Sequence, residues 1–455
     1  MTLKEFIQLV SRQAGLMLPT EWEDLDEIPL ARRFLSAANR FFYQTYEGIG
    51  VADFEGTEFR YVSDFHRFWE QNHEEILNVA INREQARLAA VALRATWLAH
   101  GEDVFRVNHN LHGLTPQQLA QVRFLTANQD FRQPPDDQFT VFLDHPEVFD
   151  PAAVSEDPDD FLTSMGLNRL SQSDKRRDFA RNAARFLTEN QINAFQIAEH
   201  FDNDAAAIRQ AIIGFGNTGY GEKKTNMFIR DMFVWNVWPG MANFDRIDVA
   251  SDINTMKVAL RTRILQTDIP LLSSFLDIFC HQYGHIDRMS AQAWRAVWEE
   301  WRTLDFTTAP ASPCLLDFII YRLGREYCKP MAGRYECEIG GHHYYHYGNR
   351  KVERICAICS AQVPPVRNMA RLTDYVMPCQ VPAAALPRNP DGSLRLDADN
   401  LLHTLQGQCL FTPVCRPTTD EFRLLMPPRS ISVKGQTGWT DAYSDVEQGG
   451  GGLSS

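Results

Sequence analysis

Four glycines in one short stretch constrain the fold of this chain more than any other feature. Residues 214–228 read GFGNTGYGEKKTNMF, and the helical pattern DAAAIRQAII runs directly into them. Glycine adopts positive φ angles without the steric cost that a side chain brings, so the stretch can turn sharply. A Lys-Thr pair after the last glycine opens a second helical pattern. The order predicts a helix, a hairpin and a second helix.

The predicted hairpin is a candidate phosphate-binding site. The first N–H groups of a helix have no partner inside that helix and carry a partial positive charge, which favours an anion. Glycines also let a phosphate approach the backbone closely. The residues expected to contact the phosphate here are Gly214, Gly216, Gly219, Gly221 and Thr225.

The chain is long enough for two or three domains. It has 455 residues, of which 44% are hydrophobic, so substantial cores can form. Helical periodicity dominates up to about residue 110 and again after residue 160, while residues 130–160 are rich in proline and acids, which favour turns. We therefore predict a mainly α protein. The expected parts are an N-terminal helical region (1–130), a central helical domain (160–328), a Cys/His-rich metal-binding module (329–365), an irregular C-terminal region (366–440) and a disordered tail (441–455).

The hydropathy pattern excludes the membrane class. No stretch approaches the roughly 18 uncharged apolar residues of a spanning helix, and the first residues, MTLKEFIQLVSRQAG, mix charges with apolar positions. We expect a soluble, unsecreted, cytoplasmic protein with no membrane partner.

A carboxylate, Asp252, follows the hairpin in the sequence and precedes a further helical pattern. Asp252 opens the segment DINTMKV, and Lys257 and Val258 stand at its sixth and seventh positions. Glycine hairpin, Lys-Thr pair and carboxylate in this order resemble the helix-hairpin-helix DNA glycosylase superfamily, in particular its endonuclease III and archaeal 8-oxoguanine DNA glycosylase branches. The resemblance covers residues 160–359. It implies a helical glycosylase-like domain, DNA as partner, Lys257 as a further DNA contact, and cleavage of an N-glycosidic bond.

The resemblance also implies a catalytic lysine, and two adjacent lysines compete for the position. Counting from Gly219 gives Lys223, whereas counting from the Lys-Thr pair gives Lys224, which we favour. A lysine that attacks the sugar and forms a Schiff base must be neutral, and a neighbouring cation lowers a lysine pKa. The alternative is that both lysines only bind phosphate or solvate the helix end.

The implied charge stabiliser is Asp252. A carboxylate near the sugar stabilises the positive charge that develops as the base leaves, or activates a nucleophile. Asp248 is the second choice and Asp245 the third. The alternative role for Asp252 is to cap the helix INTMKVALRTRIL, since aspartate is a favoured N-cap residue.

The cysteines indicate a local metal site. All nine lie at or after Cys280, which does not fit a disulfide framework spread through the chain. Cys356 and Cys359 form a Cys-x-x-Cys knuckle, which is typical of zinc sites. We expect a structural zinc held by Cys328, Cys337, Cys356 and Cys359, with His342, His343 or His346 as substitutes.

An iron–sulphur cluster is the alternative for this module. The segment DFIIYRLGREYC resembles the last helix of the endonuclease III branch, in which the final cysteine, here Cys328, is the first cluster ligand. The wide spacing from Cys328 to Cys337 and then to Cys356 departs from the closely spaced cysteines of that branch. Zinc therefore fits the spacing better.

The charge balance opposes the DNA assignment. A formal net charge of −13 disfavours nonspecific phosphate binding, so a basic face is required. The candidate residues for that face are Lys223, Lys224, Arg230, Lys257, Arg261 and Arg263, with Arg350, Lys351 and Arg354 in the cysteine module. Trp235 and Trp238 stand at helical spacing nearby and are expected in the core.

The expected function is excision of a damaged or modified base from DNA, with AP lyase activity if the lysine attacks. Base excision repair is the ordinary setting that the resemblance implies, and defence against modified phage DNA is a second. Two alternatives from other classes are a non-catalytic helix-hairpin-helix DNA-binding protein and a protein-interaction scaffold.

Overall fold

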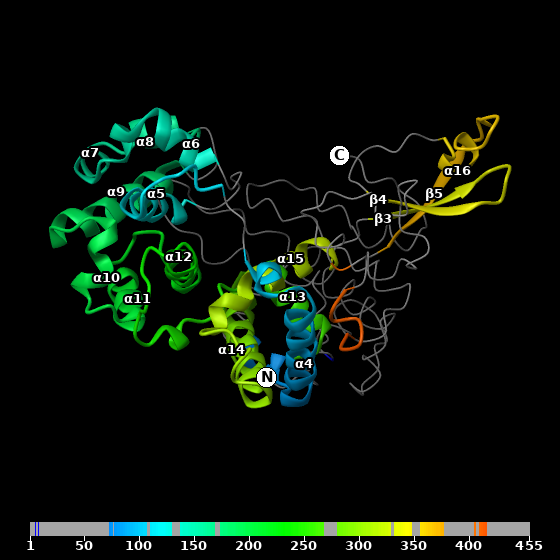
Figure 1. Ribbon diagram of the computed structural model, residues 1–455, viewed down its shortest axis with the longest axis horizontal. Coiled ribbons are helices and arrows are strands. Elements are labelled where there is room, and N and C mark those ends of the chain that lie inside the picture. The colour runs from blue at the N-terminus through cyan, green and yellow to red at the C-terminus, as the bar shows by residue number, and fades with distance from the viewer. Residues whose placement is uncertain are drawn as a thin grey trace. The chain divides into compact units, whose positions relative to one another are not determined.

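The fold is mainly helical, as the sequence predicts (Figure 1). The structure is a computed structural model that describes residues 72–75, 77–106, 110–129, 137–168, 173–267, 280–328, 332–347, 355–376 and 409–415, together with Glu5, Gln8 and Leu405. Residues 9–71, the predicted tail 441–455 and most of 366–440 lie outside this set. Of the described helices, none is both long enough and apolar enough to cross a membrane.

The chain forms two compact units, each built from separate segments. The first unit comprises Met1–Thr96, Ile253–Glu300 and Ile320–Ser455, and the second comprises Trp97–Asp252 and Trp301–Ile319. The predicted central domain, residues 160–328, is therefore divided between them. Residues 137–160, which we placed at a connection, lie inside the second unit.

The second unit is a set of helices joined by short connections. Its principal helices are α5 (Pro116–Ala127), α6 (Asp137–Asp144), α7 (Pro151–Glu156), α8 (Asp159–Ser164), α9 (Ser173–Asn190), α10 (Ile197–His200), α11 (Ala205–Gly214) and α12 (Glu222–Val234). Short 3-10 turns lie at Glu102–Phe105, Pro146–Phe149, Ala194–Gln196, Phe244–Arg246 and Pro313–Leu316.

Local sequence explains where these helices begin. Thr115 and Gln118 form a reciprocal capping box at the start of α5. Asp204 accepts hydrogen bonds from the first N–H groups of α11, and the bond from Ala207 lowers the pKa of Asp204. Pro146 and Pro151 stand in the first turn of their helices, where a missing N–H costs nothing. The prolines of residues 137–160 thus start helices where the sequence pattern predicted turns.

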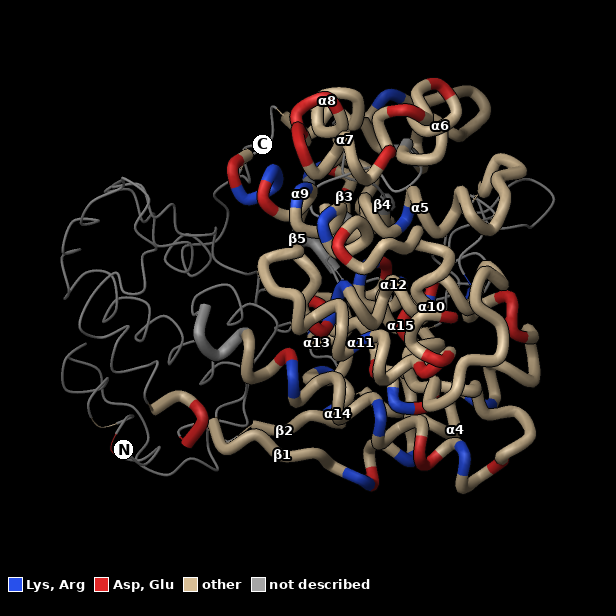
Figure 2. The backbone as a smooth tube through the Cα atoms, turned by 90° about the vertical axis from the view of Figure 1, so that its left-hand side faces the viewer, with Lys and Arg blue, Asp and Glu red and all other residues tan. Residues whose placement is uncertain are grey.

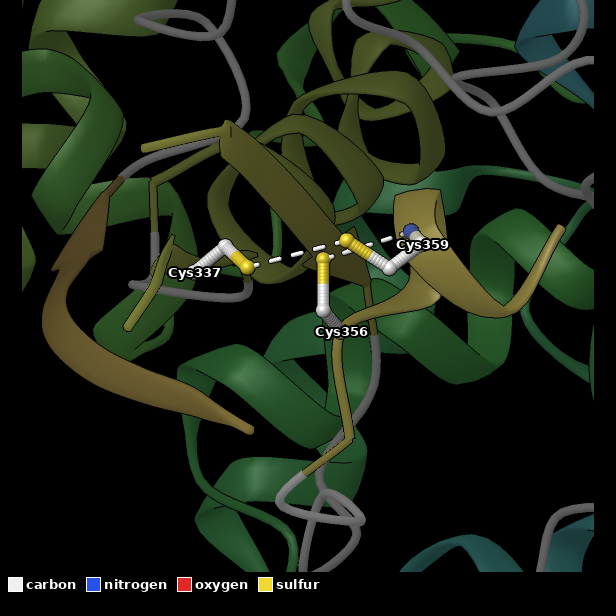
Figure 3. A group of neighbouring side chains, drawn as sticks. All are labelled: Cys337, Cys356 and Cys359. Atoms are coloured by element: carbon white, nitrogen blue, oxygen red, sulfur yellow. Dashed lines mark hydrogen bonds between the residues drawn. The ribbon is translucent and has the colours of Figure 1, made fainter. Parts of the chain in front are cut away.

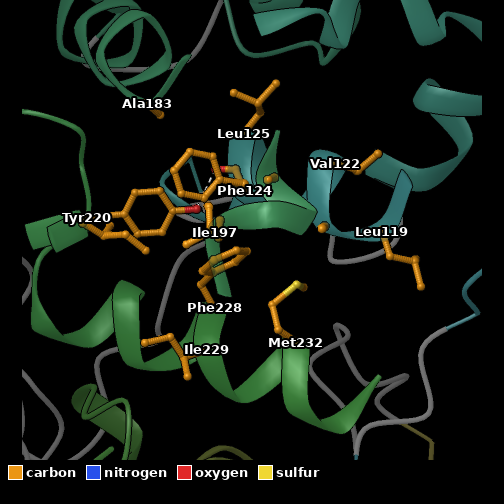
Figure 4. Close-up of a cluster of buried hydrophobic side chains, with 14 of the residues drawn as sticks. Leu119, Val122, Phe124, Leu125, Ala183, Ile197, Tyr220, Phe228, Ile229 and Met232 are labelled. Atoms are coloured by element: carbon orange, nitrogen blue, oxygen red, sulfur yellow. Dashed lines mark hydrogen bonds between the residues drawn. The ribbon is translucent and has the colours of Figure 1, made fainter. Parts of the chain in front are cut away.

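An aromatic core holds the second unit together (Figure 4). The ring of Phe124 on α5 stacks on Tyr220 at a centroid distance of 5.3 Å and meets Phe228 on α12 edge-on at 5.3 Å. Trp238 is buried, as predicted, and its Nε1 donates to the Phe195 carbonyl at 3.0 Å. Trp235 is half-buried and packs edge-on against Phe139. These rings fix α12 against α5.

Three of the described helices contribute residues to both units: α4 (Arg83–His100), α14 (Cys280–Leu304) and α15 (Asp317–Glu326). A fourth helix, α13 (Ile253–Arg261), belongs to the first unit. The strands β1 (Ala80–Ile81) and β2 (Leu265–Gln266) pair antiparallel in the first unit. Trp294 on α14 is fully buried there, and its Nε1 donates to the Thr255 carbonyl on α13 at 3.3 Å. Gly324 on α15 packs so closely on Asn254 that a Cβ would overlap the Asn254 carbonyl.

A small antiparallel sheet in the first unit carries the cysteine module. Its strand order is β4 (His343–Tyr347), β3 (Ala332–Cys337) and β5 (Ala370–Val376). The short helix α16 (Ala357–Ser360) precedes β5. Tyr335 on β3 faces Tyr344 on β4, and their rings stack at 5.3 Å.

Candidate functional site

The glycine hairpin joins α11 and α12 as the sequence predicts. Gly214 is the last residue of α11, and the connection 215–221 contains Gly216 at φ 79° and Gly219 at φ 75°. Gly221 is the N-cap residue of α12, with a φ of −90°. Positive φ explains the glycines at 216 and 219, because side chains rarely tolerate this region.

Hydrogen bonds to α9 and to the C-terminal end of α5 hold the hairpin. The Asn128 amide donates to the Thr218 carbonyl at 2.9 Å and to the Phe179 carbonyl at 3.0 Å. Asn182 donates to the Asn217 carbonyl at 3.1 Å. The Tyr220 hydroxyl donates to the Phe124 carbonyl at 2.6 Å. The path of the turn is therefore set by the helices beneath it.

The start of α12 has no side-chain cap among the described residues. Its first N–H groups, at Glu222, Lys223 and Lys224, follow the exposed Gly221. Thr225, which we expected to contact DNA, is fully buried and donates from Oγ1 to the Gly221 carbonyl at 2.9 Å. The Thr225 hydroxyl therefore stabilises the first turn of α12 and is not accessible to a ligand.

The two candidate lysines lie in different surroundings. The Lys224 amine donates to the Asn128 carbonyl and lies 5.9 Å from the centroid of the Phe179 ring. It is half-buried between the helix and the body of the unit. Lys223, one residue earlier, is exposed. The register that we favoured selects Lys224, whose amine makes a structural contact. The other register selects Lys223, whose side chain is accessible.

A buried carboxyl lies near the hairpin and escaped the sequence reasoning. Asp317, the first residue of α15, is 6% exposed, and one of its oxygens accepts a hydrogen bond from Arg230 on α12. The preceding residues are anchored, because Ser312 Oγ donates to the Ile247 carbonyl at 2.8 Å and the Cys314 N–H donates to the same oxygen at 3.2 Å.

The electrostatics of Asp317 link both parts of the predicted site. Burial raises the pKa of Asp317 to about 7, Arg230 opposes this rise, the Asp252 carboxylate adds to it, and Lys223 opposes it. Asp252 is half-buried and immediately precedes α13, the position from which we expected it to act. Lys223 from α12 and Asp252 therefore both influence one buried carboxyl.

A chain of buried charges continues from Asp317 into the core. Arg230 also bonds Asp231 at 2.6 Å, and Asp231 in turn accepts from Arg123 Nε at 2.8 Å. Arg230 divides its donors between two carboxylates, and its charge does not offset the burial that raises the pKa of Asp317. Burial raises the pKa of the neighbouring Cys314 thiol to about 12, so Cys314 is no nucleophile at neutral pH.

The other predicted site residues lie in connections between helices or are buried. Asp248 is half-buried in the connection before α13, and Asp245 is exposed in the turn Phe244–Arg246. Lys257, expected to contact DNA, is 5% exposed, and Arg261 is 8% exposed. They do not form the basic face that we expected, because both side chains are buried.

Acidic residues lie on α7, on α8 and in the connection between these helices of the second unit (Figure 2). They are Glu156, Asp157, Asp159 and Asp160.

A small cavity beside Arg230 and Asp231 is lined by Trp235, Leu315 and Phe318 and has a volume of about 20 Å³. This volume suits a water molecule rather than a nucleobase.

Three cysteines of the first unit meet at the edge of the small sheet (Figure 3). The Sγ atoms of Cys337, Cys356 and Cys359 all lie within 4.8 Å of one another, and all three residues are buried. Cys337 Sγ and Cys359 Sγ are 3.7 Å apart, so they are thiols rather than a disulfide. Three buried cysteines thus lie close enough to bind a metal ion.

Cys328, which we expected as a fourth ligand, does not belong to this group of described residues. It follows α15, and its carbonyl accepts a hydrogen bond from Arg261. The side chain of His346 and residues 348–354, which include Arg350, Lys351 and Arg354, lie outside the described set.

In comparisons with known proteins, the chain matches no protein-family model and no curated protein.

Proposed function

We propose that the protein is a DNA glycosylase that excises a damaged or modified base by cleaving its N-glycosidic bond. The observation that supports this proposal is a buried carboxyl, Asp317, which accepts a hydrogen bond from Arg230 on α12 and whose pKa is influenced by Lys223 and Asp252. An amine and two carboxyl groups from separate helices suit a reaction in which positive charge develops on a sugar.

In the lysine route, the Lys223 amine attacks the sugar carbon, so that a C–N bond forms as the N-glycosidic bond to the base breaks. Asp252 stabilises the developing positive charge. Asp317, whose pKa of about 7 makes both protonation states available at neutral pH, takes up the proton that the amine loses on attack and returns a proton to the departing base. The product would be a Schiff base, and strand cleavage would follow. Lys224 supports the hairpin in this scheme because its amine already bonds the Asn128 carbonyl.

In the water route, a carboxylate activates water and the abasic site is left uncut. Asp252 is half-buried and is the first candidate for this base. The two routes share Asp252 but differ in their need for Lys223. Removal of the Lys223 amine therefore separates them.

The DNA contact that we propose is the start of α12. Helix N-terminal N–H groups attract phosphate, and here they follow a glycine with no capping side chain among the described residues. Gly216 and Gly221 have open space around a would-be Cβ, so the backbone is accessible at these positions. Lys223 adds a positive charge next to them.

We further propose that the cysteine group holds a structural zinc ion. A tetrahedral zinc site with Zn–S bonds of about 2.3 Å has sulfurs about 3.8 Å apart, and Cys337 and Cys359 have their sulfurs 3.7 Å apart. An iron–sulphur cluster takes four cysteines, and the described residues bring three together. Bound zinc would fix the thiolates and tie two chain segments together.

Base release from duplex DNA carrying oxidised, alkylated or phage-type modified bases tests the glycosylase proposal. We expect release of at least one base, abolished by Asp252→Asn. In the lysine route, borohydride traps the wild-type protein on DNA and fails to trap Lys223→Ala. The exposed lysine Lys175 on α9 supplies the matched control, and Lys175→Ala should leave trapping unchanged.

The same experiment separates the alternative functions. Binding of duplex DNA without release of any base in the panel would indicate a non-catalytic DNA-binding protein. Absence of both release and DNA binding would overturn the DNA assignment and favour an interaction scaffold. Release from repair-type or phage-type bases would distinguish base excision repair from antiviral defence.

A further inference from the structure

We propose that His342 is the fourth ligand of the metal ion, which completes a Cys₃His zinc site with Cys337, Cys356 and Cys359. This inference rests on the proposed zinc site. It replaces Cys328 with a residue from the turn between β3 and β4. It is carried by the register of the two strands and by the space around Gly340.

The strand register places His342 directly across from Cys337. On β3 and β4, Tyr335 pairs with Tyr344 and Glu336 pairs with His343. The next pair is Cys337 with His342, and the Cys337 N–H donates to the His342 carbonyl at 2.8 Å. Residues directly opposite each other in an antiparallel pair have their side chains on the same face, about 5 Å apart at Cβ. His342 and Cys337 are therefore cross-strand neighbours.

The surroundings of Gly340 locate the imidazole beside the sulfur. A Cβ built on Gly340 would come 2.7 Å from His342 Nε2 and 3.3 Å from Cys337 Sγ. The ring nitrogen and the thiol thus face the same small space, and glycine is the residue that leaves this space open. His342 is outside the tight group of three sulfurs, so binding requires a side-chain rotation toward the ion.

His343 is excluded as a ligand by the same register. Successive side chains on a strand point to opposite faces. His343 pairs with Glu336, so both lie on the face opposite Cys337. His343 is also exposed. It therefore serves as a matched control on the adjacent position.

The described side chains of Cys328, Cys409 and Cys415 in the first unit do not join the group of three sulfurs. Cys328 lies at the end of α15, with its carbonyl bonded to Arg261. The Cys415 N–H donates to the Phe411 carbonyl at 2.8 Å, and Phe411 stacks on Trp294 of α14. Neither Cys415 nor Cys409 joins the group of three sulfurs found among the described residues.

The polar groups around the sulfurs suit metal-bound thiolates. The Gly340 N–H donates to Cys337 Sγ at 3.2 Å, the Cys359 N–H to Cys356 Sγ at 3.5 Å, and Asn368 Nδ2 to Cys359 Sγ at 3.3 Å. Such bonds orient ligands and stabilise their charge. Three thiolates and one neutral imidazole fill a tetrahedron, so the site is closed and structural.

The test uses the full chain. We expect one zinc per wild-type chain and, after exchange into Co²⁺, the visible absorption of a tetrahedral S₃N site. His342→Ala should lower zinc affinity at least about tenfold in a competition with a chelator, because even outer-shell changes cost this much. His342→Cys should restore affinity and shift the cobalt spectrum to that of an S₄ site. His343→Ala should match the wild type.

The outcomes distinguish the two proposals. A wild-type chain that binds no zinc overturns the proposed zinc site and the His342 inference with it. Zinc binding in which His342→Ala retains both the affinity and the cobalt spectrum of the wild type overturns only the role of His342. Far-UV circular dichroism of each variant identifies loss of fold, and the His342→Cys spectrum reports ligation by residue 342 if His342→Ala is unfolded.

Discussion

The ring of Phe179 occupies the space that a side chain at Gly219 would need. A Cβ on Gly219 would come 2.6 Å from Phe179 Cγ, and the residue has a φ of 75°. Backbone conformation and packing therefore both require glycine here. Because Phe179 belongs to α9, this contact seats the hairpin on the body of the second unit.

Gly219→Ala is expected to destabilise the second unit by about 2–4 kcal/mol, because it combines a strained φ with overpacking. Gly216→Ala is the matched control in the same turn, since its φ is 79° but nothing lies within 4 Å of its would-be Cβ. It should cost about 1 kcal/mol, from the backbone alone. Urea unfolding followed by circular dichroism measures both. Equal losses would mean that Phe179 does not confine the turn.

Substituting each of the two adjacent lysines in turn separates an effect on catalysis from an effect on stability. Lys224→Met removes the donor to the Asn128 carbonyl and should cost about 1–3 kcal/mol, with borohydride trapping retained at temperatures where the variant is folded. Lys223→Met should change stability by less than about 0.5 kcal/mol, since Lys223 is exposed, and should abolish trapping. The reverse pattern would return the nucleophile to Lys224.

Asp317 should make stability fall as the pH rises. Its folded pKa of about 7 lies above the unfolded value near 3.8, so between these values the folded state holds a proton that the unfolded state has lost. The stabilisation is full below about pH 4 and is lost as the pH passes through about 7. Asp317→Asn should remove this contribution, so its unfolding free energy should fall less steeply over that window. Parallel curves for the two proteins would contradict the raised pKa.

Breaking the buried ion pair of Arg123 should be costly. Arg123 and Asp231 are both nearly inaccessible, so Arg123→Met removes a buried cation from Asp231 and should destabilise by about 3–5 kcal/mol. The control is Arg185→Met on α9, which breaks the exposed pair with Glu189 and should cost less than about 1 kcal/mol. Thermal unfolding of the two variants provides the comparison. A small loss for Arg123→Met would show that Arg123 contributes little to neutralising Asp231.

Sequence reasoning succeeded where the determinants are local. Gly216 and Gly219 of the hairpin sit at positive φ, and the Cys356–Cys359 spacing brings two sulfurs together, because both features depend on a few consecutive residues. The start of the helix after Asp252 was also predictable. In each case, the sequence spacing alone restricts the geometry.

Sequence reasoning was insufficient where contacts between distant segments determine the exposure or the neighbours of a residue. Lys257 has the spacing of a DNA contact but is buried, because tertiary packing rather than spacing sets exposure. Asp317 was missed because its neighbours Lys223 and Asp252 are far from it in sequence. The one available signal was a lone acid in the apolar run CLLDFII. A charge in such a run needs a partner when it is buried.

The order of synthesis determines when the proposed catalytic group can be complete. Lys223 and Asp252 belong to the segment Trp97–Asp252, but Asp317 arrives only with Trp301–Ile319, after a stretch of the other unit has been made. A nascent chain that ends before residue 317 has the hairpin but lacks the carboxyl that binds Arg230. Any fragment from such a truncation should therefore be inert toward DNA bases, even if its hairpin still engages phosphate.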